Sequence, residues 1–493
     1  MSNKLTRIIT AILIATGCMA GFCAEIHPKD AGTIRKEAFD KDPGWDGQNN
    51  RAARKLKPET IKQDFGYNPN TNHTGGKPGE IGGRVFPASE PAYYAKSIPA
   101  LTLNNRISAS GRMLVGKGGS NMLFGFFNNT TINEWRTPNA IVWRINGRGE
   151  VYHAHMEFMT GKWRATSGVI ERYDSASDRN LLVELPCGVV QDWSFEYDPS
   201  GDSGNGAISF SVAGIRSSVN LTPGFKADGA VFNQFGILNV IKSYDGAGDI
   251  WIDRLVINGK TQNLDRDPKW VGLRNRSTYA TRGLRPRFDF GFSPTRYAGG
   301  SSSGELGGTI YRGDCRYPDK MAGYGDRIDA LTLDRPLYAS GKVTMRRGVS
   351  DSTTSFGFYN STHSLAVSDS QKYGTPRDFL GIYIEGPSRD GFYFYPFYRG
   401  HAGDPAPGYP KDPPHILPDG SVHDWTLIYN PDEAEGKGRI TVTLDGRTSS
   451  RDLAPGVKQS GTVFDRFGIV TSWIDGNAQE VYLDDLQYTY RQD

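Results

Sequence analysis

The chain repeats its own sequence over a long period, and this repetition constrains its fold more than any other feature. Residues 40–51, Asp-Lys-Asp-Pro-Gly-Trp-Asp-Gly-Gln-Asn-Asn-Arg, return 225 positions later as residues 265–276, Asp-Arg-Asp-Pro-Lys-Trp-Val-Gly-Leu-Arg-Asn-Arg. Further blocks return in the same order with a widening shift: 64–67 as 289–292, 79–83 as 304–308, 100–103 as 330–333, 124–128 as 356–360, 192–193 as 424–425, 231–237 as 463–469 and 251–255 as 482–486. We therefore predict two copies, 39–263 and 264–493, each long enough to form a whole domain rather than a solenoid unit.

Both copies have the texture of β-structure. Apolar and polar residues alternate in short runs such as 141–145, 193–197 and 440–444, and turn signals such as Asn146-Gly147 and Asp445-Gly446 bound these runs. The 60 glycines and the 12% of aromatic residues suit a chain of strands and turns. We predict an all-β fold, namely two tandem antiparallel β-sandwich domains of the jelly-roll kind.

Four segments near the end of the second copy carry a family resemblance: 423–429, 438–446, 464–469 and 481–486. They resemble the closing strands of concanavalin A-like, laminin-G-like sandwiches, and the resemblance covers roughly the last third of each copy. It implies a fold that faces glycans, because that superfamily includes lectins, glycoside hydrolases and polysaccharide lyases. The fold alone does not choose among them. The duplicated whole also resembles a family of exported bacterial proteins, which implies no particular activity.

The first residues are typical of a targeting segment. Lys4 and Arg7 precede an apolar run, 8–15, and small residues lead to a cleavage site after Ala24. We predict a signal peptide, 1–24, a linker, 25–38, and a secreted or periplasmic protein. Cys18 offers lipid attachment as an alternative, but Ala15 stands where such signals usually carry Leu, so we prefer simple secretion.

Several classes of function are disfavoured. The chain has 57 basic and 54 acidic residues, so its overall charge does not predict a nucleic-acid partner. No later apolar run is long enough to span a bilayer, and no phosphate loop, dinucleotide fingerprint or paired Cys-x-x-Cys is present. We predict no required cofactor and make no prediction of the oligomeric state. Cys187 and Cys315 remain in the mature chain, and whether they pair is left open.

The first copy carries titratable residues on one strand. In the run 152–158, the side chains of His153, His155 and Glu157 share a face, with the histidines about 6.6 Å apart along the strand. They are candidates for acid and base catalysis or for a shared metal ion, and the alternative is a polar face in solvent. Candidate substrate-binding residues beside them, present in this copy, are Arg144, Trp135 and Trp163; Trp135 is equally suited to plug the gap between domains.

The second copy differs at the same place. The run 392–401 aligns Tyr393 and Tyr395 with the histidines, and on a regular strand Arg399 and His401 share their face, although Pro396 is expected to break the strand or mark an edge. Aromatic rings cover the apolar face of a sugar ring, and an Arg fork binds an oxyanion. The fold resemblance implies a lyase role for Tyr and His, which take the proton α to a uronate carboxylate in lyases of this fold. Aromatic packing under a lid loop is the alternative.

Two further sets of carboxylates need an interpretation. Glu385, on the strand before Tyr393, is a candidate acid or base facing the same groove. The repeated segment suggests a structural calcium site if the first and last strands are neighbours, with ligands from Asp40, Asp42, Asp253, Asp265, Asp267 and Asp484. The alternative is turn capping by Asp and Asn, with Trp45 and Trp270 closing the cores, and a similar structural role for Glu80 and Glu305.

These observations favour an exported carbohydrate-active protein. The first hypothesis is a lyase or glycoside hydrolase that acts on a polysaccharide, anionic sugars included, with one copy catalytic. The second is a non-catalytic glycan-binding protein with two sandwich modules, and a third is a structural envelope protein. The divergence between the two faces favours the enzyme, because a pure binder gains avidity from two similar sites.

Overall fold

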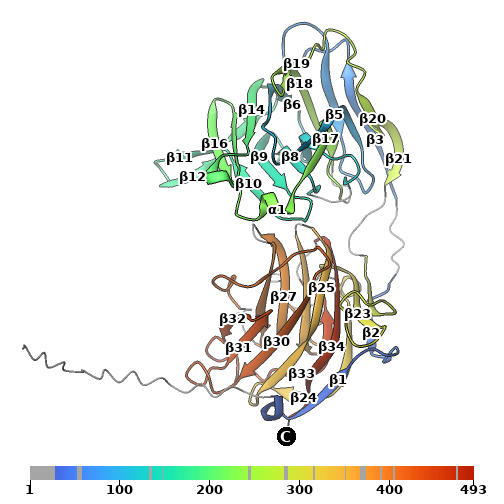
Figure 1. Cartoon of the computed structure of the whole chain (residues 1–493), viewed down its shortest axis with the longest axis vertical. Coiled ribbons are helices and arrows are strands. Elements are labelled where there is room, and N and C mark those ends of the chain that lie inside the picture. Colours follow the sequence, from blue (N-terminus) through green and yellow to red (C-terminus); the bar gives the residue numbers. More distant parts are fainter. Residues whose placement is uncertain are drawn as a thin grey trace, which may run out of the picture.

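The computed structural model describes residues 28–52, 58–132, 136–147, 149–242, 246–281, 287–314, 317–349, 351–366, 374–388, 391–402, 406–472 and 476–492. Almost all regular structure within these ranges is antiparallel β-sheet, which confirms the predicted all-β class. The helices are one turn long: η1 (Pro28–Ala31), η2 (Asp202–Gly204), α1 (Phe225–Asp228) and η3 (Pro318–Lys320). Figure 1 shows the strands gathered into two bodies, which we call the first and the second sandwich.

Two sheets enclose the core of the first sandwich. The β9 sheet has the order β10 (Ala165–Val169), β9 (Val151–Met159), β8 (Ala140–Gly147), β7 (Asn121–Phe127), β17 (Val231–Asn239), β5 (Tyr93–Thr102) and β20 (Val271–Leu273), with β13 (Glu184–Pro186) on β9. The β14 sheet has the order β16 (Ile215–Asn220), β15 (Ala207–Val212), β14 (Gln191–Asp198), β6 (Ile107–Val115), β18 (Gly248–Ile257), β4 (Glu80–Val85), β3 (Glu59–Asn68) and β21 (Arg276–Thr281), with β19 (Lys260–Thr261) on β18. A separate hairpin joins β11 (Glu171–Asp174) to β12 (Arg179–Leu182).

The second sandwich is built in the same way. The β30 sheet has the order β22 (Asp289–Ser293), β23 (Glu305–Tyr311), β34 (Ala478–Arg491), β25 (Leu337–Gly348), β30 (Val422–Asn430), β31 (Arg439–Leu444) and β32 (Arg447–Asp452), with β1 (Thr33–Glu37) on β34. The β27 sheet has the order β2 (Asp46–Gln48), β24 (Gly323–Thr332), β33 (Val463–Val470), β26 (Ser352–Tyr359), β27 (Phe379–Ser388), β28 (Gly391–Arg399) and β29 (His415–Ile416).

Alternating side chains build each core. On β14, Trp193 and Phe195 point inward and meet Phe124 and Phe126 of the opposite sheet, with ring centroids 5.0 and 5.8 Å apart. Such edge-to-face pairs add about 0.5–1.5 kcal/mol each to the burial of apolar area. Trp425 meets Phe356 in the same way in the second sandwich, at 5.2 Å. The period-2 pattern of the sequence therefore predicts the inner faces correctly.

The two repeated opening segments lie on opposite sandwiches. β2, from the first occurrence of the segment, pairs with β24 of the second sandwich, and β20, from the second occurrence, pairs with β5 of the first. The tryptophans of the two segments are exchanged in the same way. Trp45 packs on Tyr324 of the second sandwich and Trp270 on Tyr94 of the first, each pair with ring centroids 5.9 Å apart. The strands of the sheets are thus drawn from 59–281 and from 33–48 with 289–491. The division of the sequence into copies at 263/264 stays a prediction.

Some sequence predictions fall outside the described residues. The predicted leader and Cys315 are among them, so secretion and a bridge from Cys315 to Cys187 stay predictions. Cys187 is half-buried, with its Sγ 3.3 Å from the carbonyl oxygen of Gly116. In the part of the chain that is described, no helix has the length and apolar character needed to cross a membrane.

Candidate functional site

The predicted strand of the first copy is β9, and its three titratable side chains share the outer face of the sheet. Tyr152 and Met156, on the opposite side of β9, lie in the core. β9 pairs with β8 so that His155 lies opposite Arg144. This register brings Arg144 to Glu157, whose carboxylate oxygen Oε1 lies 2.7 Å from Arg144 Nε.

Glu157 is sequestered rather than open to a substrate. Its side chain is buried between Arg144 and Arg136, and Arg136 Nε lies 3.1 Å from its second oxygen. Burial alone would raise the pKa of Glu157, but the two guanidinium groups lower it. Burial and the Arg144 charge also lower the pKa of His155 to about 4. Arg144, expected to bind substrate, instead neutralises a buried carboxylate.

An apolar cluster also lies on this face, formed with Ile132 from the segment between β7 and β8; its other members include Tyr93, Leu123, Phe127, Val142 and Leu238. His153 and His155 are half-buried. The expectation that Trp163 is an exposed stacking residue is wrong. Its side chain is 9% exposed and packs into the core cluster of the second sandwich. Trp135 lies outside the described residues.

The outer face of the β27 sheet carries a buried polar network centred on Glu385. Arg312, directly after β23, donates from Nη2 to the Glu385 carboxylate at 3.0 Å and from Nε to Thr353 at 2.8 Å. The hydroxyl groups of Tyr395 and Tyr409 also donate to Glu385. Burial raises the pKa of Glu385, while Arg312 and the Tyr395 hydrogen bond oppose the rise. The carboxylate is therefore fully bonded within the protein.

Three rings stand over this network at the surface. Tyr393 and His415 are half-buried, and Tyr409 is 56% exposed. The ring of Tyr393 lies 5.0 Å from that of Tyr409 and 5.1 Å from that of His415. We call Tyr393, Tyr409 and His415 the aromatic platform. Sequence reasoning found Tyr393 but missed the other two; Gly408 and Pro410 beside Tyr409 indicate a loop at the surface, which is the signal that the sequence offers.

Pro396 and Arg399 of β28 differ from what the sequence predicts. Pro396 does not break β28, which stays paired with β27 as far as Phe379 opposite Arg399. Arg399 shares the outer face but is buried, and its Nη1 donates to the carbonyl oxygen of Thr375 at 3.1 Å. Its predicted role as a fork for a sugar oxyanion is therefore corrected to a structural one.

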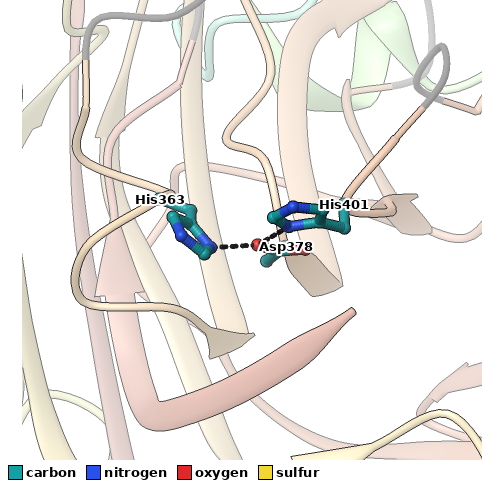
Figure 2. A group of neighbouring side chains, drawn as sticks. All are labelled: His363, Asp378 and His401. Atoms are coloured by element: carbon teal, nitrogen blue, oxygen red, sulfur yellow. Dashed lines mark hydrogen bonds and ion pairs between the residues drawn. The ribbon is translucent and has the colours of Figure 1, made fainter. Parts of the chain in front are cut away.

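His401 lies beyond the end of β28 and belongs to a different group. Its Nδ1 lies 3.0 Å from a carboxylate oxygen of Asp378, and His363 Nδ1 lies 2.5 Å from the same oxygen. Figure 2 shows the two imidazoles on either side of the carboxylate. His363 and Asp378 were not found from the sequence. Asn139 holds the position before β8 that Asp378 holds before β27, and both have a positive φ, so a comparison of the two copies could have found Asp378.

Two of the repeated aspartates, Asp42 and Asp267, cap turns. Asp42 accepts a hydrogen bond from the backbone of Gly44, and Asp267 accepts one from Lys269, both at 2.9 Å. Glu80 and Glu305 hold loop backbones in the same manner, and Glu305 accepts from the backbone of Ala298 at 2.7 Å. The structural interpretation of these carboxylates agrees with these contacts.

The late aspartates are buried to different degrees. Asp484 is fully buried, and burial, with repulsion from Asp485 and Glu305, raises its pKa to about 7. Burial also raises the pKa of Asp253. Among the described residues, the predicted calcium ligands do not come together as a group of three: Asp40, Asp42, Asp253, Asp265, Asp267 and Asp484. Structural calcium stays a prediction.

Comparison with known proteins gives matches of structure only. No protein-family model matches the sequence, and no curated protein matches it. Matching solved structures include mouse laminin α1 chain domains LG4-5 (13% identity, 87% of this chain and 92% of that chain, TM-score 0.23), an alginate lyase, Aly36B, in complex with alginate trisaccharide (12%, 41% and 88%, 0.27) and peanut lectin (15%, 41% and 89%, 0.26).

Proposed function

We propose that the protein binds a polysaccharide at the outer face of the β27 sheet, with the aromatic platform as its contact surface. The observation that carries the proposal is the adjacency of three partly exposed rings, Tyr393, Tyr409 and His415, on one sheet face. Flat rings with polar edges suit sugars, because they cover the apolar face of a pyranose while their hydroxyl and imidazole groups reach its hydroxyls.

The buried network beneath the platform supports this function. The hydroxyl of Tyr409 donates to Glu385, and Arg312 holds Glu385 from the other side. Tyr409 is therefore anchored at its hydroxyl end although its ring is exposed. Fixing an exposed side chain before binding removes an entropic cost of about 0.5–1.5 kcal/mol when the ligand arrives.

Binding fits the two sheet faces better than cleavage. Glu157 and Glu385, the two predicted carboxylate catalysts, lie in different sandwiches, and each is buried and paired with arginine. A glycosidase needs two carboxyl groups about 5–10 Å apart, on either side of the bond that breaks. The hypothesis of a lyase or glycoside hydrolase stays a prediction.

One experiment separates these functions. The protein is incubated with neutral, uronic and sulfated polysaccharides, retention is measured by affinity electrophoresis, and products are analysed by mass spectrometry. Retention by at least one polysaccharide without shortened products supports the proposal. Products heavier by one water would show hydrolysis, unsaturated products would show a lyase, and either would replace binding as the function. Lack of both retention and products across the panel would contradict any polysaccharide function.

A further inference from the structure

Two histidines and an aspartate meet at one end of the β27 sheet. Asp378 directly precedes β27, and His401 follows β28 by two residues. The two strands pair in register up to Phe379 opposite Arg399, so the residues just beyond this pair come to the same edge. His363 reaches the same point from the turn that follows β26 (Figure 2).

The three side chains present nitrogen and oxygen atoms at the spacing of a metal site. The Nδ1 atoms of His363 and His401 lie 2.5 and 3.0 Å from one oxygen of Asp378, and all three ligand atoms lie within 4.8 Å of one another. Ligand atoms about 2.0–2.1 Å from a tetrahedral ion are about 3.3 Å apart. Small side-chain movements therefore suffice to place an ion among the three.

The carboxylate in this group is incompletely bonded without an ion. Asp378 is fully buried, and its Oδ1 has no hydrogen-bond partner among the described residues. A buried acceptor without a partner is costly, and a cation would relieve that cost. The histidine side chains are 36% and 40% exposed, so one side of the group is open to solvent.

Backbone contacts fix the two histidines before any ligand binds. The backbone N–H of His363 donates to Asn360 Oδ1 at 2.9 Å, and that of His401 donates to Thr462 Oγ1 at 2.9 Å. The Ser364 hydroxyl donates to the carbonyl oxygen of Arg377 at 2.6 Å. This bond joins the turn that contains His363 to the segment before Asp378. Ligands held in this way lose little freedom on binding.

We propose that His363, Asp378 and His401 bind a divalent transition-metal ion, with Zn²⁺ as the reference ion. Two imidazoles and one carboxylate match the preferences of Zn²⁺ and its neighbours, whereas Ca²⁺ and Mg²⁺ prefer oxygen ligands alone. Three protein ligands with one side open to solvent leave a coordination position for water or another ligand. This site goes beyond the proposed function and does not depend on it.

The test measures Zn²⁺ binding to the untagged chain after chelator treatment and dialysis. Isothermal titration and competition with a chromophoric chelator give affinity and stoichiometry, and circular dichroism checks that each variant is folded. We expect one Zn²⁺ per chain, a rise in Tm on Zn²⁺ addition, and weak binding of Ca²⁺ and Mg²⁺. His363→Ala and His401→Gln should each weaken Zn²⁺ binding at least about tenfold and remove the rise in Tm.

A matched control lies in the same sandwich. His423 Nδ1 lies 2.5 Å from Asp445 Oδ2, which is a similar His–Asp contact. His423→Ala should bind Zn²⁺ as the unaltered chain does. Three results would overturn the proposal: no Zn²⁺ binding by the unaltered chain, equal affinity for Mg²⁺, or full Zn²⁺ affinity in a folded His363→Ala/His401→Gln double variant. With the first or third result the group is a hydrogen-bonded His–Asp–His cluster, and with the second it is not a site selective for transition metals.

Discussion

Asn275 donates its side-chain amide to the backbone carbonyl oxygen of Phe65 at 2.6 Å, although 210 residues separate them in the chain. Asn50 makes the corresponding bond to Phe290 at 2.5 Å. Asn275 lies in the second occurrence of the repeated segment and bonds to the first sandwich. Asn50 lies in the first occurrence and bonds to the second sandwich. The repeated segment thus has a structural reason: it closes one edge of each sandwich, in an exchanged arrangement.

This exchange predicts reciprocal effects of two substitutions. Trp45→Ala should destabilise the second sandwich by about 3 kcal/mol, because it empties the contact with Tyr324 and loosens the edge strand β2, which covers β24. Trp270→Ala should do the same to the first sandwich through Tyr94. Hydrogen exchange measured by mass spectrometry would locate each loss of protection. Faster exchange of the first sandwich in Trp45→Ala would contradict the exchanged arrangement.

Glu157 is expected to contribute stability. Glu157→Gln removes the charge that two arginines share in a buried site, and we expect a loss of about 3–5 kcal/mol in the free energy of unfolding. Glu196→Gln is the matched control, because Glu196 pairs with Arg106 at an exposed position, where an ion pair contributes less than about 1 kcal/mol. Denaturant titration measures both. Similar small losses in the two variants would mean that Glu157 is not structural and is free for another role.

His155 gives the first sandwich a predictable response to acid. Its pKa is lowered from 6.5 to about 4 by burial and by Arg144. Between these two pH values the unfolded chain binds a proton on His155 that the folded chain does not bind. The free energy of unfolding should therefore fall as the pH falls from about 6.5 to 4. The slope for one proton is at most about 1.4 kcal/mol per pH unit. His155→Gln should flatten the curve in this window, and parallel curves for the two proteins would contradict the assignment.

Much of the fold follows from sequence patterns, because alternation and turn residues act locally. Asp445 and Gly446, predicted as a turn, both have a positive φ and join β31 to β32 as a two-residue hairpin loop. The same alternation places His153, His155 and Glu157 on one face of β9. What surrounds a face is set by tertiary contacts that alternation does not encode.

The contacts around Glu157 and Glu385 could not be predicted from local sequence patterns. Arg136 reaches Glu157 from the segment before β8, and Tyr409 reaches Glu385 from the segment between β28 and β29. These contacts bury Glu157 and Glu385 and bond them within the protein. The exchange of β2 and β20 cannot be predicted from the sequence either, because the two occurrences of the repeated segment are similar enough to fit either sandwich.

The aromatic platform gives the central claim its most direct test, which is the retention of single-residue variants on the polysaccharide that binds the unaltered protein best. We predict that Tyr409→Ala and Tyr393→Ala each lose about tenfold or more in affinity, corresponding to about 1.4 kcal/mol per contact. Tyr173→Ala, which removes an equally exposed tyrosine from β11 in the first sandwich, should bind as the unaltered protein does. Unchanged affinity in the two platform variants, or an equal loss in Tyr173→Ala, would contradict binding at this face.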